Sequence, residues 1–247
     1  MGKIAFSVLL GSLAFAGSAQ AQSGYPDEYA LRPVQLPESM LQLHVPVVFN
    51  IAPGSFGDYV AIPLDIRVGL SHELELRLFH PVNGLCLRGC GKKYNDLALG
   101  LLYALMRDSN SQLSLLGALE VTSFASPATL RLDVGVAYKY FQGAWSIGTT
   151  PYLGVGLNHR DWNGDGINIP VEFAYQLSHP MALFAVSGLY GSTKHFGDDW
   201  HMPLGFGLNY LVQHAFDLGA EIVLNNAIGN GDSDNSTFIV YASWRNQ

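Results

Sequence analysis

Residues 161–172, DWNGDGINIPVE, have the residue types and spacing of a calcium-binding loop. Asp161, Asn163, Asp165, Gly166 and Glu172 occupy ligand and glycine positions of the EF-hand pattern, in which oxygen atoms surround a hard cation. An EF-hand also needs a helix on each side, whereas both flanking segments alternate as strands do and contain proline. Two interpretations remain. Asp161, Asn163 and Asp165 form a helix-free Ca²⁺ site in the 161–166 loop, or, as we favour, the segment is a turn rich in Asn-Gly and Asp-Gly.

The N-terminus has the features of an export signal. Lys3 supplies a positive charge, residues 4–15 are apolar, and Ala19-Gln20-Ala21 matches an A-x-A cleavage site. We therefore predict a signal peptide over 1–21. The alternative, an uncleaved anchor, is disfavoured because the apolar run is short for a membrane span.

The two cysteines, Cys86 and Cys90, lie close together in NGLCLRGCGKK. An exported chain passes through an oxidising compartment, so we predict a local disulfide that closes a small ring. Metal binding is the alternative, but this spacing is not a zinc pattern and only His80 lies near in sequence.

The sequence carries no recognisable catalytic motif. It lacks both the G-x-S-x-G elbow and the H-E-x-x-H helix, and its eight histidines are scattered. We predict that the protein is not an enzyme. A membrane-embedded hydrolase stays as an alternative, because triads can assemble from residues far apart in the chain.

Composition points towards a membrane barrel. Charged residues make up 13% of the chain, about half the usual share in soluble domains. Outside the signal, no apolar stretch is long enough for a spanning helix, and a closed barrel is the other structure that satisfies every backbone group in lipid. The net charge of −7 argues against nucleic acid as a partner.

Period-two alternation supports an all-β chain. In ATLRLDVGVAYKYF, large apolar residues alternate with charged or small ones, as on a strand with two different faces. The segment 95–106 is the least regular, and a short helix is the alternative there. Twelve strands are predicted, over 39–49, 59–69, 72–80, 95–106, 111–123, 128–141, 144–158, 167–177, 181–190, 201–212, 215–225 and 236–244.

The connections alternate between short turns and longer Gly/Asp/Asn-rich loops, as periplasmic turns and extracellular loops do in outer-membrane barrels. A soluble β-sandwich, the alternative at the fold level, has no reason to sort its loops in this way. Aromatic residues at the ends of strands beside the short turns predict an interfacial girdle. Its members are Tyr140, Trp145, Tyr175, Tyr210, Phe216 and Trp244.

The charged residues share the face opposite the large apolar residues, which predicts a polar lumen. Their mixed signs can line a water-filled path or pair into networks that fill the barrel. The predicted solute path is Asp65, Arg67, Glu73, Glu75, Arg77, Arg131 and Asp133; Glu120, Lys139, Glu172, Asp217 and Glu221 share that face.

The mature chain resembles porin-like or transporter-like outer-membrane barrels of the phenol-degradation MetA type, including its approach ALRPVQLPESMLQL to the first strand. The resemblance implies a 12-stranded antiparallel up-and-down barrel over 39–247, preceded by a periplasmic segment over 22–38. It implies passive passage of small solutes or ions across the bacterial outer membrane, with membrane lipid and the barrel-insertion machinery as partners and no cofactor beyond the possible Ca²⁺. A non-conducting barrel whose loops bind or scaffold is the alternative. The sequence does not say whether 22–38 enters the lumen.

Overall fold

The structure is a computed structural model that describes residues 25–51, 57–81, 83–94, 96–124, 127–194, 196–230 and 236–246. The predicted signal peptide lies outside these residues. The strands are β1 (Leu41–Ile51), β2 (Val60–Ile62), β3 (Asp65–Gly69), β4 (Leu74–Phe79), β5 (Leu85–Arg88), β6 (Leu97–Arg107), β7 (Ser111–Ser123), β8 (Thr129–Gln142), β9 (Trp145–Thr149), β10 (Tyr152–Gly156), β11 (Gly166–Ser178), β12 (Met181–Ser192), β13 (Trp200–Gln213), β14 (Phe216–Gly229) and β15 (Ser236–Arg245).

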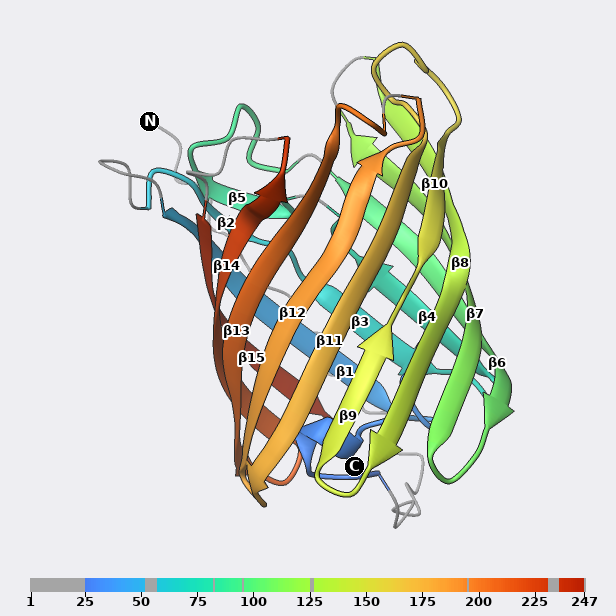
Figure 1. The fold of residues 1–247 in the computed structure, drawn as a ribbon, viewed down its shortest axis with the longest axis vertical. Coiled ribbons are helices and arrows are strands. Elements are labelled where there is room, and N and C mark those ends of the chain that lie inside the picture. Colours follow the sequence, from blue (N-terminus) through green and yellow to red (C-terminus); the bar gives the residue numbers. More distant parts are fainter. Residues whose placement is uncertain are drawn as a thin grey trace, which may run out of the picture.

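These strands form one closed antiparallel barrel (Figure 1). Each strand pairs with its neighbours in sequence, and β15 pairs with β1 from Gln42–Arg245 to Ile51–Ser236, which closes the sheet. Closure leaves no unpaired sheet edge along this seam. The predicted all-β barrel fold is confirmed, and the soluble sandwich is wrong.

The fifteen segments make twelve strands around the barrel, as predicted. Two predicted strands are each interrupted beside a proline. Pro63 separates β2 from β3, and Pro151 separates β9 from β10, because proline has no N–H to donate to the ladder of hydrogen bonds. The segment β5 pairs with β2 as β4 pairs with β3, so it extends the β4 strand through a region that the sequence analysis had placed in a loop. The segment predicted over 95–106 is the strand β6, so its helix alternative is wrong.

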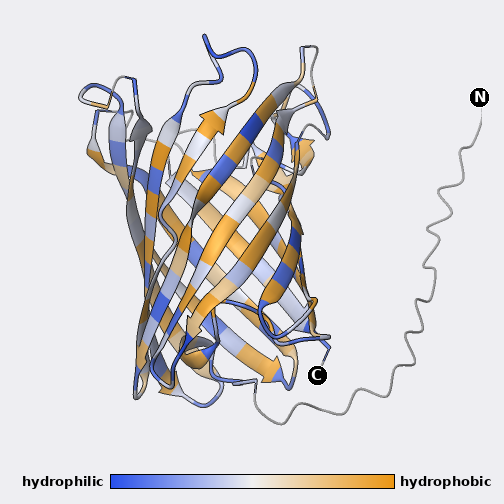
Figure 2. Cartoon of the chain, turned by 90° about the vertical axis from the view of Figure 1, so that its right-hand side faces the viewer, coloured by the Kyte–Doolittle hydropathy of each residue, from blue (hydrophilic) through white to orange (hydrophobic). Residues whose placement is uncertain are grey.

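The outer surface of the barrel is apolar. On β6, Leu99, Leu101, Tyr103 and Leu105 are exposed, and they alternate with inward residues such as Leu102. Hydrophobic residues recur along the strands around the whole barrel (Figure 2). An exposed apolar surface that surrounds a molecule is typical of contact with lipid.

No helix in the described part of the chain is long and apolar enough to cross a membrane.

Glycines on the inner face receive aromatic rings from the neighbouring strand. Gly207 is paired with Phe184 and Gly219 with Tyr241, and a Cβ atom on either glycine would overlap the ring opposite. The ring therefore lies flat against the wall instead of filling the lumen. This accounts for the frequent small residues on the inward face.

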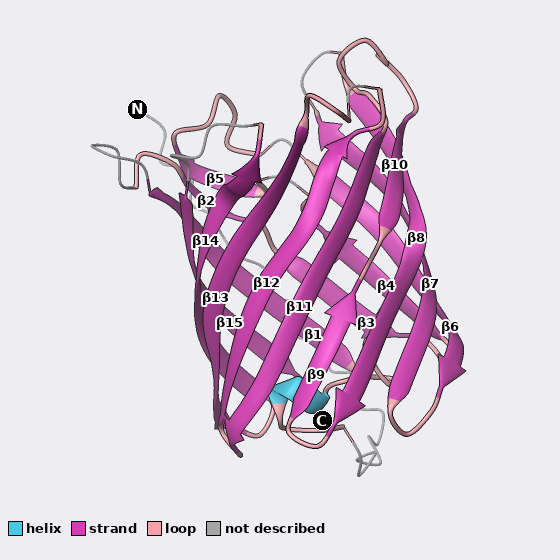
Figure 3. Cartoon of the chain, in the orientation of Figure 1, coloured by secondary structure: helices cyan, strands magenta, loops and turns pink. Residues whose placement is uncertain are grey.

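The two ends of the barrel differ. One end, here called the turn end, carries the tight connections at 70–73, 108–110, 143–144, 179–180 and 214–215, together with the C-terminus (Figure 1). The opposite, loop end carries the longer connections. The short 3-10 helix η1 (Tyr29–Leu31) lies within the turn end, enclosed by the strands (Figure 3). The N-terminal segment therefore enters the barrel, a point that the sequence left open.

Candidate functional site

Residues 25–40, here called the plug, are anchored inside the turn end by a buried ion pair. The Arg32 guanidinium donates from Nη1 and Nη2 to the Asp217 carboxylate on β14, at 2.9 and 2.7 Å. Arg245 on β15 also donates to Asp217, whose side chain is fully buried. Two guanidinium groups thus share one carboxylate, and charge-assisted pairing compensates for the removal of these groups from water.

The opposite side of the plug is hydrogen-bonded to the wall formed by β3, β4 and β6. Gln35 Nε2 donates to the Leu102 carbonyl at 2.8 Å, and the Leu36 N–H donates to the Glu75 carboxylate at 2.6 Å. Arg67 Nη2 donates to the Val34 carbonyl at 2.5 Å. Because both sides of the barrel hold it, the plug spans the turn end of the lumen.

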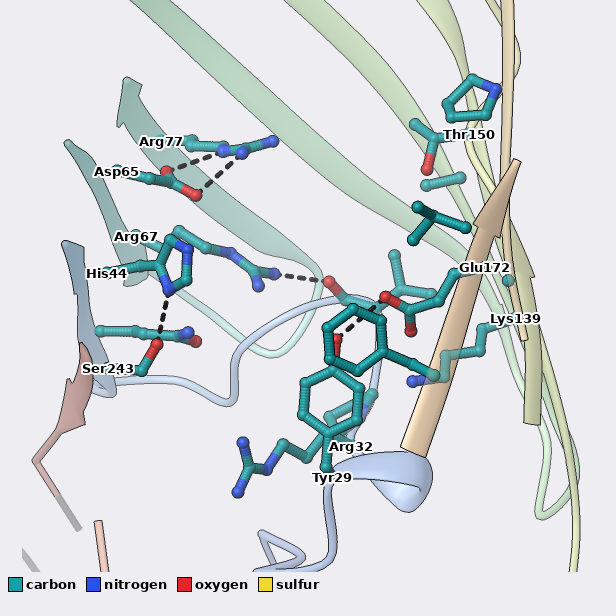
Figure 4. A pocket seen from close by; sticks show the side chains of 18 of the residues that line it. Tyr29, Arg32, His44, Asp65, Arg67, Arg77, Lys139, Thr150, Glu172 and Ser243 are labelled. Carbon is teal, nitrogen blue, oxygen red and sulfur yellow. Dashed lines mark hydrogen bonds and ion pairs between the residues drawn. The ribbon is translucent and has the colours of Figure 1, made fainter. Parts of the chain in front are cut away.

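A third group of contacts holds η1 against β11 and β12. The Tyr29 hydroxyl donates to the Glu172 carboxylate at 2.9 Å (Figure 4). The Tyr29 ring stacks on Phe184 with centroids 5.5 Å apart. Burial, followed by the negative charge of Glu172, raises the pKa of Tyr29 well above its usual value. The phenol therefore stays a neutral donor to Glu172.

Beyond the plug, the lumen contains a cavity of about 620 Å³ with charged groups on its walls. On one wall, Arg77 pairs with Asp65 through two contacts of 2.8 Å, and Arg67 pairs with Glu75 at 2.7 and 2.8 Å. Lys139 lies on the facing wall beside Glu172 (Figure 4). Its ammonium group is 5.5 Å from the centre of the Phe141 ring, within the range of a cation–π contact. Charged groups of both signs facing one cavity suit a hydrated path for small polar solutes.

Four of the seven predicted path residues, Asp65, Arg67, Glu75 and Arg77, line this cavity. Arg131 and Asp133 are paired with each other at 2.9 Å from Nε to Oδ1, and they line other recesses.

Glu73 does not line the cavity; it lies in the exposed turn before β4, so its place on the solute path stays a prediction. An alternating sequence pattern can be counted beyond the residue at which the strand ends. In the structure the chain leaves the barrel wall at the turn, so the inward or outward assignment no longer applies there.

His44 and Ser243 form a pair that sequence analysis missed. They face each other in the β1–β15 register, with His44 Nδ1 2.6 Å from Ser243 Oγ. Asp65 faces His44 in the β1–β3 register, but both of its carboxylate oxygens bind Arg77. The three residue types of a hydrolytic triad are therefore adjacent, yet the acid is committed to another partner. Sequence analysis could have indicated these neighbours only by showing that positions on three separate strands face the lumen at the same height.

Two of the three predicted calcium ligands, Asp165 and Asn163, make contacts within the loop or to the adjoining strand. Asp165 accepts from the Gly156 N–H at 3.1 Å and pairs with Arg160, while Asn163 Nδ2 donates to the Leu130 carbonyl at 2.7 Å. Glu172 lies in the lumen against the plug. No group of three His, Cys, Asp or Glu residues is arranged to hold a metal ion in the described ranges. The arrangement favours the turn interpretation.

Cys86 and Cys90 form a disulfide with Cα atoms 6.1 Å apart. It closes a hairpin at the loop end in which the Cys86 N–H donates to the Lys93 carbonyl at 2.7 Å.

The predicted girdle residues Tyr140, Trp145, Tyr175, Tyr210, Phe216 and Trp244 all lie near the turn end. Trp145 faces Tyr175, and Phe216 faces Trp244, in neighbouring strands. Tyr175, Tyr210 and Trp244 are exposed on the outer surface, and the other three are half-buried.

No protein-family model matches the chain, and no curated protein matches it. The finer MetA-type resemblance therefore stays a prediction. Among solved structures, the chain is similar to a KdgM porin, with a TM-score of 0.60 and 9% identity over 81% of this chain and 98% of that one. It is also similar to an outer membrane channel from Pseudomonas putida F1, with a TM-score of 0.56 and 13% identity over 85% and 97% of the two chains. At these identities the likeness shows the fold, which is that of outer-membrane β-barrel porins and channels.

Proposed function

We propose that the protein is a channel of the bacterial outer membrane that allows passive passage of small solutes or ions. The observation that carries this proposal is the charged cavity inside a barrel whose outer surface is apolar. A barrel that served only to fill the membrane would not need inward ion pairs such as Arg77–Asp65, whose groups remain partly accessible from the cavity. The porin and channel folds of its structural neighbours support the same function.

The plug gives this channel a narrow turn end, which would be the periplasmic end in a barrel with both termini on that side. Passage then requires either a gap beside the plug or its displacement. The same feature favours a second candidate, a non-conducting barrel whose outer loops bind or scaffold, because buried contacts hold the plug on both sides of the lumen. In either case, outer-membrane lipid and the insertion machinery would be partners.

Single-channel recording of the refolded mature protein in a planar bilayer tests the proposal. We expect small, discrete current steps in the wild type. Arg77→Gln should shift the reversal potential in a salt gradient towards cation preference, because Asp65 would lose its counter-charge. Arg88→Gln is the matched control, since Arg88 is an exposed residue at the loop end. A protein that inserts without conducting, under all voltages tried, would exclude the channel and favour the non-conducting barrel.

A further inference from the structure

A recess of about 650 Å³, here called the loop-end recess, lies at the loop end and is lined by residues of β8, β11, β12 and β13. The connection between β10 and β11 rises beside it (Figure 1). Tyr190 and His201 line the recess and stack on each other, with ring centroids 5.4 Å apart. Trp162 also lines it and is 61% exposed. Aromatic walls that carry a few polar groups are typical of small-molecule sites of this size.

The strand register brings an amide group against the two stacked rings. Asn168 on β11 faces Tyr190 on β12, and Tyr190 faces His201 on β13. The Nδ2 atom of Asn168 is buried, yet it makes no hydrogen bond within the described part of the chain. A buried donor without an acceptor is unfavourable, so this position is suited to a ligand that supplies an acceptor.

Arg131 on β8 brings a second set of donors to the same recess. Its Nε donates to Asp133 at 2.9 Å, but among the described residues neither of its Nη atoms makes a hydrogen bond. The guanidinium group lies across Gly154 on β10, where a Cβ atom would overlap it. Gly154 is paired with Gly166 on β11, and this glycine pair allows the long side chain to reach towards β11.

The donors of Arg131 and Asn168 meet over Gly166, which also lines the recess. A Cβ atom on Gly166 would lie 3.3 Å from Arg131 Nη2, 4.0 Å from Asn168 Nδ2 and 3.5 Å from the carbonyl oxygen of Gly191. A hydroxyl group suits this position, because its oxygen can accept from the two nitrogen donors while its hydrogen is donated to the carbonyl. A carboxylate would place its negative charge against the same carbonyl oxygen.

The charges around the recess also favour a neutral ligand. Its lining contains equal numbers of cationic and acidic side chains. The cations are Arg131, Arg160 and Lys194, and the acids are Asp161, Asp165 and Asp199. With His201 neutral, these charges cancel, so the recess gives little net attraction to an anion or to a cation. The acids can instead accept hydrogen bonds from the hydroxyl groups of a neutral ligand.

We infer that the loop-end recess binds a neutral saccharide, with one hydroxyl group over Gly166 between Arg131 and Asn168 and a face of C–H bonds against its aromatic rings. A sugar ring carries several hydroxyl groups that both donate and accept, and its C–H face packs on aromatic side chains. The inference deepens the proposed function and rests on it in one respect, because a saccharide held here would stand at the loop-end entrance of the lumen.

Isothermal titration calorimetry of the refolded mature protein tests the inference in lauryldimethylamine oxide, a detergent without a sugar headgroup. The probes are glucose and galactose at millimolar concentrations, each compared with its uronate and its 2-amino sugar, which carry a negative and a positive charge. We expect saturable binding of at least one neutral sugar. That sugar should bind roughly threefold or more tightly than both of its charged forms, because each of these meets like charges in the recess.

Two variants test the position over Gly166. Asn168→Asp replaces the amide donor by an acceptor of the same shape and should weaken sugar binding roughly tenfold. Gly166→Ala places a methyl group where the hydroxyl group would lie, and it should weaken binding to a similar extent. Gly164→Ala is the matched control and should bind like the wild type, because Gly164 lines the same recess but no atom lies within 4 Å of the new Cβ. A heat-modifiable gel shift confirms that each variant is a folded barrel.

Absence of saturable binding for both neutral sugars would overturn the inference. Tighter binding of a uronate or an amino sugar would also overturn it, because the recess would then select an ion. Equal losses in Gly166→Ala and Gly164→Ala would show that binding does not depend on the two converging donors. Calorimetry requires no conduction, so a barrel that conducts without binding sugar contradicts this inference alone, whereas a silent barrel that binds sugar contradicts the proposed channel alone.

Discussion

The plug should leave the lumen more often when Arg32 is replaced by alanine. The substitution removes the bidentate bonds to Asp217, at 2.7 and 2.9 Å, and a further bond of 2.6 Å to the Asp27 carbonyl. Breaking a buried ion pair destabilises by about 3–5 kcal/mol. Arg245 remains to compensate Asp217, so we take the lower value, about 3 kcal/mol.

At about 1.4 kcal/mol for each factor of ten, this loss shifts the ratio of docked to undocked plug roughly a hundredfold. In single-channel recordings, Arg32→Ala should therefore spend a much larger share of time in a higher-conductance state than the wild type. Arg88→Ala is the matched control, because it removes an arginine from an exposed ion pair with Asp58 at the loop end. Such surface pairs contribute about 0–1 kcal/mol, and its recordings should match the wild type.

Chymotrypsin provides a second readout that does not depend on conduction. The Tyr29 ring is packed against Phe184 and its hydroxyl is bound to Glu172, so cleavage after Tyr29 should be slow in the wild type. Arg32→Ala should accelerate this cleavage by about the same factor as the docking equilibrium shifts. Unchanged cleavage together with unchanged conductance would refute the reasoning, because Arg32 would then not hold the plug.

Three further outcomes follow from local geometry. Gly219→Ala should lower the free energy of unfolding by about 1–3 kcal/mol in urea titrations, because the new Cβ would overlap the Tyr241 ring. Gly117→Ala is the control and should be nearly neutral, because no atom lies within 4 Å of its new Cβ. Reduction of Cys86–Cys90 should speed trypsin cleavage within 88–93 yet leave the heat-modifiable gel shift intact, since a small ring contributes about 2 kcal/mol on the chain-entropy estimate. Millimolar calcium should leave the emission of Trp162 unchanged, because Asp165 already bonds to Gly156 and Arg160, and Asn163 to the Leu130 carbonyl on β8. A saturable change would instead restore the calcium interpretation.

The sequence predicted the barrel because period two is a direct consequence of a wall with lipid on one side and a lumen on the other. Leu99, Leu101 and Tyr103 face outward as their parity requires, and even the irregular strand β6 obeys the pattern. Prolines 63 and 151 interrupt strands without changing their number, since each breaks only a local part of the ladder. Segment β5 was missed because it is short and is flanked by residues typical of loops. It is identified only by its pairing with β2, which the sequence does not show.

The plug could not be predicted in the same way. Its contacts join residues far apart in the chain, such as Arg32 and Asp217, and they exist only after the barrel has closed around an irregular segment. Neither propensity nor parity applies to such a segment. Parity did place Asp217 and Glu172 on the inward face, but it could not distinguish a plug anchor from a residue of the solute path.

That distinction decides which lumen residue can report on selectivity. Arg67 and Glu75 line the cavity, but Arg67 also donates to the Val34 carbonyl and Glu75 accepts from the Leu36 N–H. Neutralising either residue alters the electrostatic field in the lumen and loosens the plug at the same time. The Arg77–Asp65 pair faces the same cavity, and within the described part of the chain its side chains hydrogen-bond to each other and not to the plug. A change of ion preference in Arg77→Gln can therefore be assigned to lumen charge, whereas the same change in Arg67→Gln would have two causes.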